Sequence, residues 1–125
     1  MDLNQITLPA LDIAASVAFY KNMGFVQIVE AAHYARFESQ TGNATFSLHK
    51  VNAVPQETGV VVYFETETLD DKVTELKQRG FLFYQDPTDE PWLWREARLK
   101  DPSSNIICLY FAGPNRKNPP WRVSK

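Results

Sequence analysis

The sequence predicts an α+β fold in which two βαβββ modules form a curved mixed sheet around a cleft. An internal repeat is the first reason, because "ITLPALDIAASVAFYKNMGF" aligns without a gap with "VYFETETLDDKVTELKQRGF" at an offset of 56 residues. The second reason is the pattern within each copy, where an alternating apolar segment typical of a strand precedes apolar residues at helical spacing. The third is that further apolar runs, separated by turn residues, follow each helix.

The first module is expected over about residues 3–55. Its opening strand is "QITLP", and Asp12 is a good N-cap residue for the helix that follows. The apolar stripe of this helix contains Ile13, Val17 and Tyr20. Gly24 supplies the left-handed residue that ends the helix. Three strands are then expected around residues 25–30, 33–38 and 44–50.

The second module is expected over about residues 58–112 and repeats this order. Its strand is "VVVYFE", and Thr68 takes the N-cap position, where with Asp71 it resembles a capping box. The helix ends at Gly80, and its apolar stripe contains Leu69, Val73 and Leu76. Strands are expected around residues 81–84, 93–100 and 105–111. The tail, residues 113–125, is expected to be extended because it contains Pro119 and Pro120.

Composition and charge are those of one globular domain over residues 1–125. The 44% of hydrophobic residues is typical of a folded protein, and the formal net charge of −2 favours neither nucleic acid nor an anionic membrane as a partner. No apolar run approaches the ~18 residues of a membrane span, and the N-terminus lacks the pattern of a signal peptide. Cys108 is the only cysteine, so no internal disulfide is expected and a reducing, cytoplasmic location is predicted.

The segments "ITLPALDIAASVAFYKNMGF" and "WREARLKDPSSNIICLYFAG" contain Asp12, Ser16, Phe19 and Tyr20 in the first and Asp101, Pro102 and Asn105 in the second. With these residues in this order, the two segments resemble the glyoxalase / bleomycin-resistance / extradiol-dioxygenase superfamily, also called vicinal oxygen chelate proteins. The family has D-x-x-x-S-x-x-F-Y and G-F early in the chain and D-P-x-G-N before an apolar strand near its end. The matching residues here are Asp12, Ser16, Phe19, Tyr20, Gly24, Phe25, Asp101, Pro102 and Asn105. The resemblance covers nearly the whole chain and implies paired βαβββ modules. Ser104 stands where the family usually has Gly, so an altered hairpin is expected there.

The resemblance also implies where a metal would bind. Enzymes of the family hold a divalent metal in the cleft with one side chain from each of four strands, whereas metal-free members bind a ligand in the same cleft. The corresponding positions hold Gln5, Ser47, Val61 and Cys108. Valine has no donor atom, serine is a poor ligand and glutamine is a weak one, so neither a metal nor another cofactor is expected.

Two alternatives for this chemistry stay open. A shifted metal site would use His49, which lies two residues beyond Ser47 on the same strand and therefore faces the same side. Its further donors would be Glu65, Glu96 and His33. Cys108 would be a nucleophile only if a neighbour such as His49 lowered its pKa; otherwise it lines the cleft as a small apolar residue. No catalytic residue is assigned.

Alternation along the predicted strands assigns a set of side chains to the cleft. These ligand-binding candidates are three aromatic residues, a thiol and three polar groups: His49, Tyr63, Trp94, Glu96, Arg98, Cys108 and Tyr110. Rings with a few polar groups are the usual lining of a pocket for an organic molecule. The alternative is that Glu96 and Arg98 form an ion pair with only a structural role.

Residues 84–94, "YQDPTDEPWLW", form the longest predicted loop. It contains two tryptophans and two prolines, and it is either a lid over a binding site or a dimer contact.

The basic tail is expected to be solvated rather than bound to nucleic acid. Because the open edges of two small sheets need cover, a homodimer is expected, with a cleft that lies within one chain or is shared between two.

The leading functional hypothesis is a metal-free protein of the vicinal-oxygen-chelate type that binds a small organic molecule, for sequestration as in antibiotic resistance or for sensing. The alternative is a glyoxalase- or dioxygenase-like enzyme, a lyase, isomerase or oxidoreductase, with a shifted or degenerate metal site. The residue types at Ser47, Val61 and Cys108 favour the first hypothesis. Its ligand is expected to be planar, with an acidic group that Arg98 contacts.

Overall fold

A computed structural model of the chain describes residues 1–39, 41–54 and 59–123. The chain divides into two compact units. Unit one comprises Met1–Val60 and the short turn Asp101–Asn105, and unit two comprises Val61–Lys100 and Ile106–Lys125. No helix among the described residues is long and apolar enough to cross a membrane.

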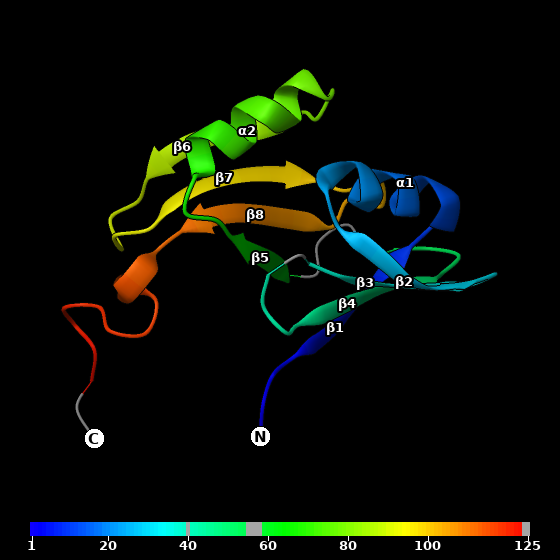
Figure 1. Cartoon of the computed structure of the whole chain (residues 1–125), viewed down its shortest axis with the longest axis horizontal. Helices are drawn as coiled ribbons and strands as arrows, with labels where there is room; N and C mark the ends of the chain where they lie inside the picture. The colour runs from blue at the N-terminus through cyan, green and yellow to red at the C-terminus, as the bar shows by residue number, and fades with distance from the viewer. Residues whose placement is uncertain (40, 55–58, 124–125) are drawn as a thin grey trace. The chain divides into compact units, whose positions relative to one another are not determined.

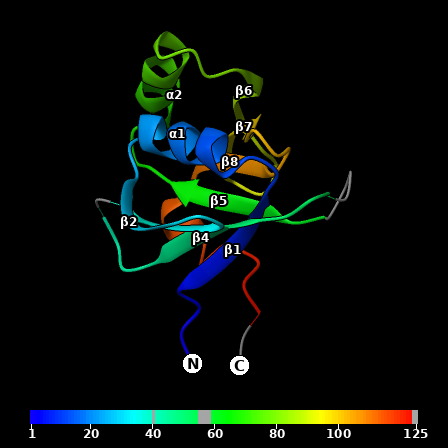
Figure 2. The same ribbon diagram turned by 90° about the vertical axis from the view of Figure 1, so that its right-hand side faces the viewer.

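Unit one is a four-stranded mixed sheet with one helix on one of its faces (Figure 1). Its elements are β1 (Gln5–Ala10), α1 (Ile13–Met23), β2 (Val26–Ala31), β3 (Tyr34–Glu38) and β4 (Thr45–Lys50). The strand order is β1-β4-β3-β2, in which β1 and β4 are parallel and the other neighbours are antiparallel. Figure 2 shows from the side that α1 covers a single face of this sheet.

Unit two repeats this architecture in the same strand order. Its elements are β5 (Val61–Glu65), α2 (Leu69–Gln78), β6 (Phe83–Asp89), β7 (Arg95–Lys100), β8 (Ile106–Phe111) and the short 3-10 helix η1 (Gly113–Asn115). The strand order β5-β8-β7-β6 again combines one parallel pair, β5 with β8, with antiparallel neighbours. The α+β class and the two βαβββ modules are therefore confirmed.

The helix ends follow the sequence signals with one exception. The Asp12 carboxylate accepts a hydrogen bond from the Ala15 N–H at 3.0 Å, so it caps α1 as predicted. Gly24 and Gly80 have positive φ angles of 116° and 92°, which close the two helices. Thr68 makes no capping hydrogen bond, so the capping box predicted for α2 is not formed.

Each unit has its own core beneath its helix. In unit one, Tyr20, Phe37 and Phe46 are buried, and the rings of Phe37 and Phe46 stack with centroids 5.1 Å apart. The buried stripe of α1 contains Ser16, Tyr20 and Met23, whereas Ile13 and Val17 of the predicted stripe are only half-buried. In unit two, the predicted stripe of Leu69, Val73 and Leu76 is buried as expected.

The turn Asp101–Asn105 is tied to unit one by hydrogen bonds. The buried Asp101 carboxylate accepts from the Tyr20 hydroxyl at 2.7 Å and from the Ser103 and Asn105 backbone N–H groups at 2.9 Å each. The Ser103 hydroxyl accepts from the Leu11 N–H at 2.9 Å. Ser104 has a φ of 66°, so it adopts the left-handed conformation that glycine favours, and the altered hairpin expected from its side chain is not needed.

The segment predicted as a long loop is mostly a strand. β6 continues to Asp89 through two register irregularities, which leaves a tight turn at residues 90–94.

The tail, predicted to be extended, folds into η1 and further turns. The Glu65 carboxylate holds its start by accepting from the Ala112 and Gly113 N–H groups at 2.8 and 2.9 Å and by pairing with Arg116 at 3.8 Å, and the Trp94 indole donates to the Asn115 carbonyl at 3.3 Å.

Candidate functional site

The face of the unit-two sheet that points away from α2 gathers most of the predicted binding residues. Side chains alternate along a strand, so burial of Ala97 and Leu99 on the helix side places Glu96 and Arg98 on the other side. In the pairing of β7 with β8, Arg98 lies opposite Cys108 and Glu96 lies opposite Tyr110. Tyr63 of β5 lies opposite Cys108 on its other side.

Three aromatic residues, Tyr63, Trp94 and Tyr110, form what we call the ring cluster. Trp94 and Tyr110 stack with centroids 4.7 Å apart and planes at 24°. The Tyr63 ring meets both edge-on, at 5.8 Å from Trp94 and 5.3 Å from Tyr110. Tyr110 is only 6% exposed, whereas Tyr63 is 41% exposed, so the cluster has a rigid base and an accessible edge.

Glu96 is a buried carboxylate beside the ring cluster, and it is 1% exposed. It accepts hydrogen bonds from the Trp92 indole at 2.6 Å, from Arg98 Nη2 at 3.1 Å and from the Cys108 thiol at 3.6 Å. A buried carboxylate is costly unless donors and an opposite charge compensate it. The ion pair of Glu96 with Arg98, left open by the sequence, is therefore present.

Arg98 keeps part of its guanidinium available. Nη2 contacts Glu96 and also donates to the Tyr63 hydroxyl at 3.3 Å, while the side chain is 23% exposed. Burial acts to lower the pKa of Arg98, but the hydrogen bond to Glu96 and the charge of that carboxylate oppose it and the pKa is raised, so the group is always charged. Within the described residues, Nε and Nη1 have no hydrogen-bond partner. They are donors that a ligand could use.

Cys108 is placed as a hydrogen-bond donor rather than a nucleophile. Its side chain is fully buried, and burial together with the negative charge of Glu96 raises the pKa of the thiol to about 12. At neutral pH the sulfur therefore stays protonated and donates to Glu96. A nucleophilic Cys108 would need a neighbour that lowers the pKa of its thiol. The surroundings within unit two raise this pKa instead.

His49 is not part of this group. It lies on β4 of unit one, where its side chain is exposed and its register partners are Pro9 and Tyr34. The structure thus brings together Tyr63, Trp94, Glu96, Arg98, Cys108 and Tyr110 within unit two, and it leaves His49 in the other unit.

The four family metal positions do not fit a metal. In unit one the Gln5 amide donates to the Ser47 hydroxyl at 2.7 Å, so these two weak ligands are engaged with each other. In unit two, Val61 has no donor atom and packs against the buried group of Cys108, Tyr110 and Ala112, and the Cys108 thiol is engaged with Glu96. Among the described residues there is also no group of three or more His, Cys, Asp or Glu side chains placed to hold a metal ion.

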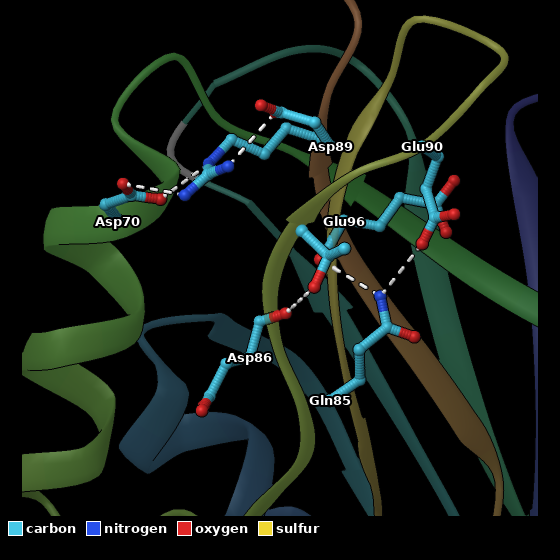
Figure 3. Close-up of polar contacts among 8 residues, drawn as sticks. Asp70, Gln85, Asp86, Asp89, Glu90 and Glu96 are labelled. Carbon is cyan, nitrogen blue, oxygen red and sulfur yellow. Dashed lines mark hydrogen bonds and ion pairs between the residues drawn. The ribbon is translucent and has the colours of Figure 1, made fainter.

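Sequence reasoning missed the role of Trp92. It lies in the turn between β6 and β7, where its indole reaches Glu96. The next residue, Leu93, has a φ of 67°, a left-handed conformation that is strained for leucine. This turn directs Trp92 towards the carboxylate and Trp94 towards Tyr110. The Gln85 amide supports the same region by donating to the Glu90 carboxylate and to the Glu96 carbonyl (Figure 3).

A groove of about 330 Å³ lies elsewhere in unit two, at the N-terminal end of α2. Its lining residues are Glu67, Thr68, Leu69, Asp70, Asp71, Arg95 and Phe111. The Arg95 guanidinium in it is already paired with two carboxylates, those of Asp70 and Asp89, which flank it in Figure 3. A groove with its cation neutralised and no ring cluster is a weaker candidate than the face around Glu96.

Comparisons with known proteins agree with this fold. A sequence model of the Glyoxalase/Bleomycin resistance protein/Dioxygenase superfamily matches residues 2–109. No curated protein matches the chain in a sequence search.

Three solved structures illustrate the likeness. A bleomycin-binding protein complexed with bleomycin has a TM-score of 0.73 and 19% identity, and the match covers 89% of this chain and 98% of that one. A bleomycin resistance determinant encoded on the transposon Tn5 has a TM-score of 0.73 and 18% identity over the same shares. A glyoxalase/bleomycin resistance protein/dioxygenase from Nocardioides has a TM-score of 0.76 and 22% identity, covering 99% of this chain and 90% of that one. At such identities the likeness shows the fold.

Proposed function

Since the chain belongs to the Glyoxalase/Bleomycin resistance protein/Dioxygenase superfamily, we propose that it binds a small organic molecule at the ring cluster of unit two. The observation that carries this proposal is the arrangement of Tyr63, Trp94 and Tyr110 beside a partly exposed guanidinium. A protein of this fold that binds bleomycin supports the same class of function. The binding would serve sequestration of the molecule, as in resistance, or sensing.

The ring cluster would supply stacking and Arg98 would supply orientation. A planar ligand resting against the exposed edge of Tyr63 gains about 0.5–1.5 kcal/mol per ring pair beyond the area it buries. Arg98 is held in place by Glu96 and Tyr63, so its remaining N–H groups are pre-organised for an oxygen acceptor on the ligand. Because Glu96 neutralises Arg98, a neutral carbonyl and a carboxylate are both suitable acceptors.

The proposed binding uses no metal and no covalent step. The family metal positions in unit two hold Val61, which has no donor atom, and Cys108, whose thiol is engaged with Glu96. Within the described residues, no observation favours the alternative of an enzyme with a shifted metal site. We therefore propose that this chain is a ligand-binding member of the superfamily.

Tryptophan fluorescence tests the proposal, because Trp92, Trp94 and Trp121 all belong to unit two. Bleomycin, a set of aromatic acids and their neutral amides would be titrated into the protein, and a ligand at the ring cluster should quench Trp94 saturably. Tyr63→Leu should weaken binding by about two- to tenfold, the equivalent of one lost ring pair. Tyr84→Leu, which removes an exposed tyrosine of β6, is the matched control and should leave binding unchanged.

Arg98→Lys tests the polar half of the proposal. It keeps a positive charge for Glu96 but loses the planar fork, so it should weaken ligands with an oxygen acceptor placed over Arg98 while leaving purely apolar ring ligands unaffected. A panel that yields no saturable quenching, or quenching indifferent to both Tyr63→Leu and Arg98→Lys, would assign the ring cluster to core packing instead.

A further inference from the structure

The sheet of unit one carries an arginine at the same place as Arg98. In the pairing of β3 with β4, Arg36 lies opposite Ser47, just as Arg98 lies opposite Cys108 in the pairing of β7 with β8. Each of these arginines also contacts a tyrosine hydroxyl, that of Tyr34 for Arg36 and that of Tyr63 for Arg98. The repeated fold thus presents one guanidinium–phenol pair in each unit.

The two arginines differ in their charge balance. Arg98 is neutralised by Glu96, whereas the position equivalent to Glu96 in unit one holds Tyr34, since Tyr34 lies opposite His49 as Glu96 lies opposite Tyr110. Arg36 forms no ion pair with any described carboxylate, including Glu38 two residues along the same strand. Its positive charge therefore remains uncompensated on a half-buried side chain.

One hydrogen bond and one ring contact, both with Tyr34, orient the Arg36 guanidinium. Nε donates to the Tyr34 hydroxyl at 3.0 Å, and the guanidinium carbon lies 5.4 Å from the centroid of the Tyr34 ring. The Tyr34 hydroxyl lies 2.5 Å from the fully buried Ser47 hydroxyl, which also accepts from the Gln5 amide at 2.7 Å. Both terminal nitrogens of Arg36 have no partner among the described residues, so they form a two-pronged donor with a fixed direction.

The hydroxyl groups of Tyr34 and Ser47 together leave one O–H group free to donate a hydrogen bond to a ligand. Two hydroxyl groups carry two hydrogens, and the contact between Tyr34 and Ser47 uses one of them whichever atom donates. The other hydrogen has no acceptor among the described residues.

We propose that Arg36, with Tyr34 and Ser47, forms an anion-binding subsite in unit one that takes a carboxylate or a similar oxyanion. Two oxygens of the anion would accept from the two terminal nitrogens of Arg36, and the remaining hydroxyl hydrogen would reach the same group. This subsite does not depend on the ring cluster of unit two, because no residue is common to both. It is also better suited to an anion than Arg98, whose charge Glu96 already balances.

The test is a titration of ¹⁵N-labelled protein with benzoate at constant ionic strength, followed by amide and arginine Nε–H signals. The expected result is saturable shifts at β3 and β4 with benzoate but not with benzamide, which has the same ring without the charge. Arg36→Gln should weaken this binding by about tenfold or more, and Tyr34→Phe should weaken it several-fold. Arg79→Gln, at the residue that follows α2, is the control for loss of one positive charge and should leave the titration unchanged.

The readouts separate this subsite from the ring cluster. Unit one contains no tryptophan among its residues, so tryptophan quenching reports the ring cluster and the β3–β4 shifts report Arg36. Equal shifts with benzamide and benzoate, linear shifts without saturation, or full retention of binding in Arg36→Gln would each overturn the proposal. The wild-type comparison of benzoate with benzamide is decisive even if a variant does not fold.

Discussion

Ser16 and Ser103 are both buried serines of unit one, but their hydroxyl groups have different surroundings. The Ser16 hydroxyl has no hydrogen-bond partner among the described residues, whereas the Ser103 hydroxyl accepts from the Leu11 N–H. Ser16→Ala should therefore raise the free energy of unfolding by up to about 1 kcal/mol, because it removes an unsatisfied polar group and adds helix propensity. Ser103→Ala should lower it by about 0.5–1.5 kcal/mol, because it removes the hydroxyl that accepts from the Leu11 N–H.

Urea unfolding of the two variants checks this pair of predictions, since each is the control for the other. A clear loss of stability in Ser16→Ala would show that its hydroxyl has a partner, for example a water molecule. Equal effects of the two substitutions would contradict the contrast between them.

Cys108 should be almost unreactive in the folded protein. A pKa raised from 9.0 to about 12 reduces the thiolate fraction near neutral pH on the order of a thousandfold, and the sulfur is also fully buried. Ellman's reagent at pH 8 should label native protein very slowly and label denatured protein at once. Fast labelling of native protein would revive the interpretation of Cys108 as a nucleophile.

The sequence predicted which side chains of β7 and β8 share a face of the sheet. It did not predict which of these side chains contact each other. Alternation along a strand is fixed by geometry, so the common face of Glu96, Arg98, Cys108 and Tyr110 was readable from the sequence. The contact between Trp92 and Glu96 was not, because it depends on Leu93 taking a left-handed conformation that leucine rarely adopts. The pairing of charges was likewise left open until the distances were known.

Two turns contain a residue other than glycine with a positive φ angle, Leu93 and Ser104, and the second of them gives a testable prediction. Ser104 has a φ of 66° in the β7–β8 turn, where a side chain costs about 1 kcal/mol relative to glycine. Ser104→Gly should therefore stabilise the protein by about that amount in thermal or urea unfolding. Ser104→Ala keeps a Cβ and should bring no gain; a destabilising Ser104→Gly would mean that the serine hydroxyl or chain stiffness matters more.

The internal repeat could be recognised in the sequence only over the first strand and the helix of each module, where the two copies are separated by a constant number of residues. β1 and β5 begin 56 residues apart, at Gln5 and Val61, so the first strand and helix of each module align directly. β6 and its turn are longer than β2 and its turn, and Arg36 is consequently 62 residues from Arg98. The equivalence of these two arginines, and with it the subsite in unit one, requires the strand register that the structure supplies.

For the whole molecule, the titration of buried groups predicts a loss of stability in alkaline solution. Burial raises the pKa of Tyr20, with help from Asp101, and burial also raises the pKa values of Cys108, Tyr63 and Tyr110. The folded protein retains these protons at a pH where the unfolded chain loses them, starting at about 9 for cysteine and 10 for tyrosine. Stability should thus be complete below about pH 9 and fall as the pH rises above it.

Urea unfolding at several pH values from 8 to 10.5 measures this effect. Tyr34, whose pKa is lowered, acts in the opposite direction but is a single group. Tyr20→Phe removes a titrating group from the core and should flatten the decline, although it also loses the hydrogen bond to Asp101 and is less stable at neutral pH. Stability that stays constant or rises over this range would contradict the burial assigned to Tyr20 and Cys108.

Assembly and location remain predictions. The sequence favours a homodimer in the cytoplasm, and sedimentation at micromolar concentration tests the first of these. A mass near the 14.3 kDa of one chain would contradict the dimer. Neither outcome changes the proposals for the ring cluster or for Arg36, since each is built from residues of a single unit.

The central claim is that this superfamily member binds an organic molecule without a metal, and native mass spectrometry combined with elemental analysis of the same purified sample tests it most directly. The account predicts a non-covalent organic adduct, formed with the ligands that quench Trp94 and weakened by Tyr63→Leu, together with far less than one divalent metal ion per chain. About one zinc, iron, manganese or nickel ion per chain, retained on desalting and lost on Gln5→Ala, would contradict it.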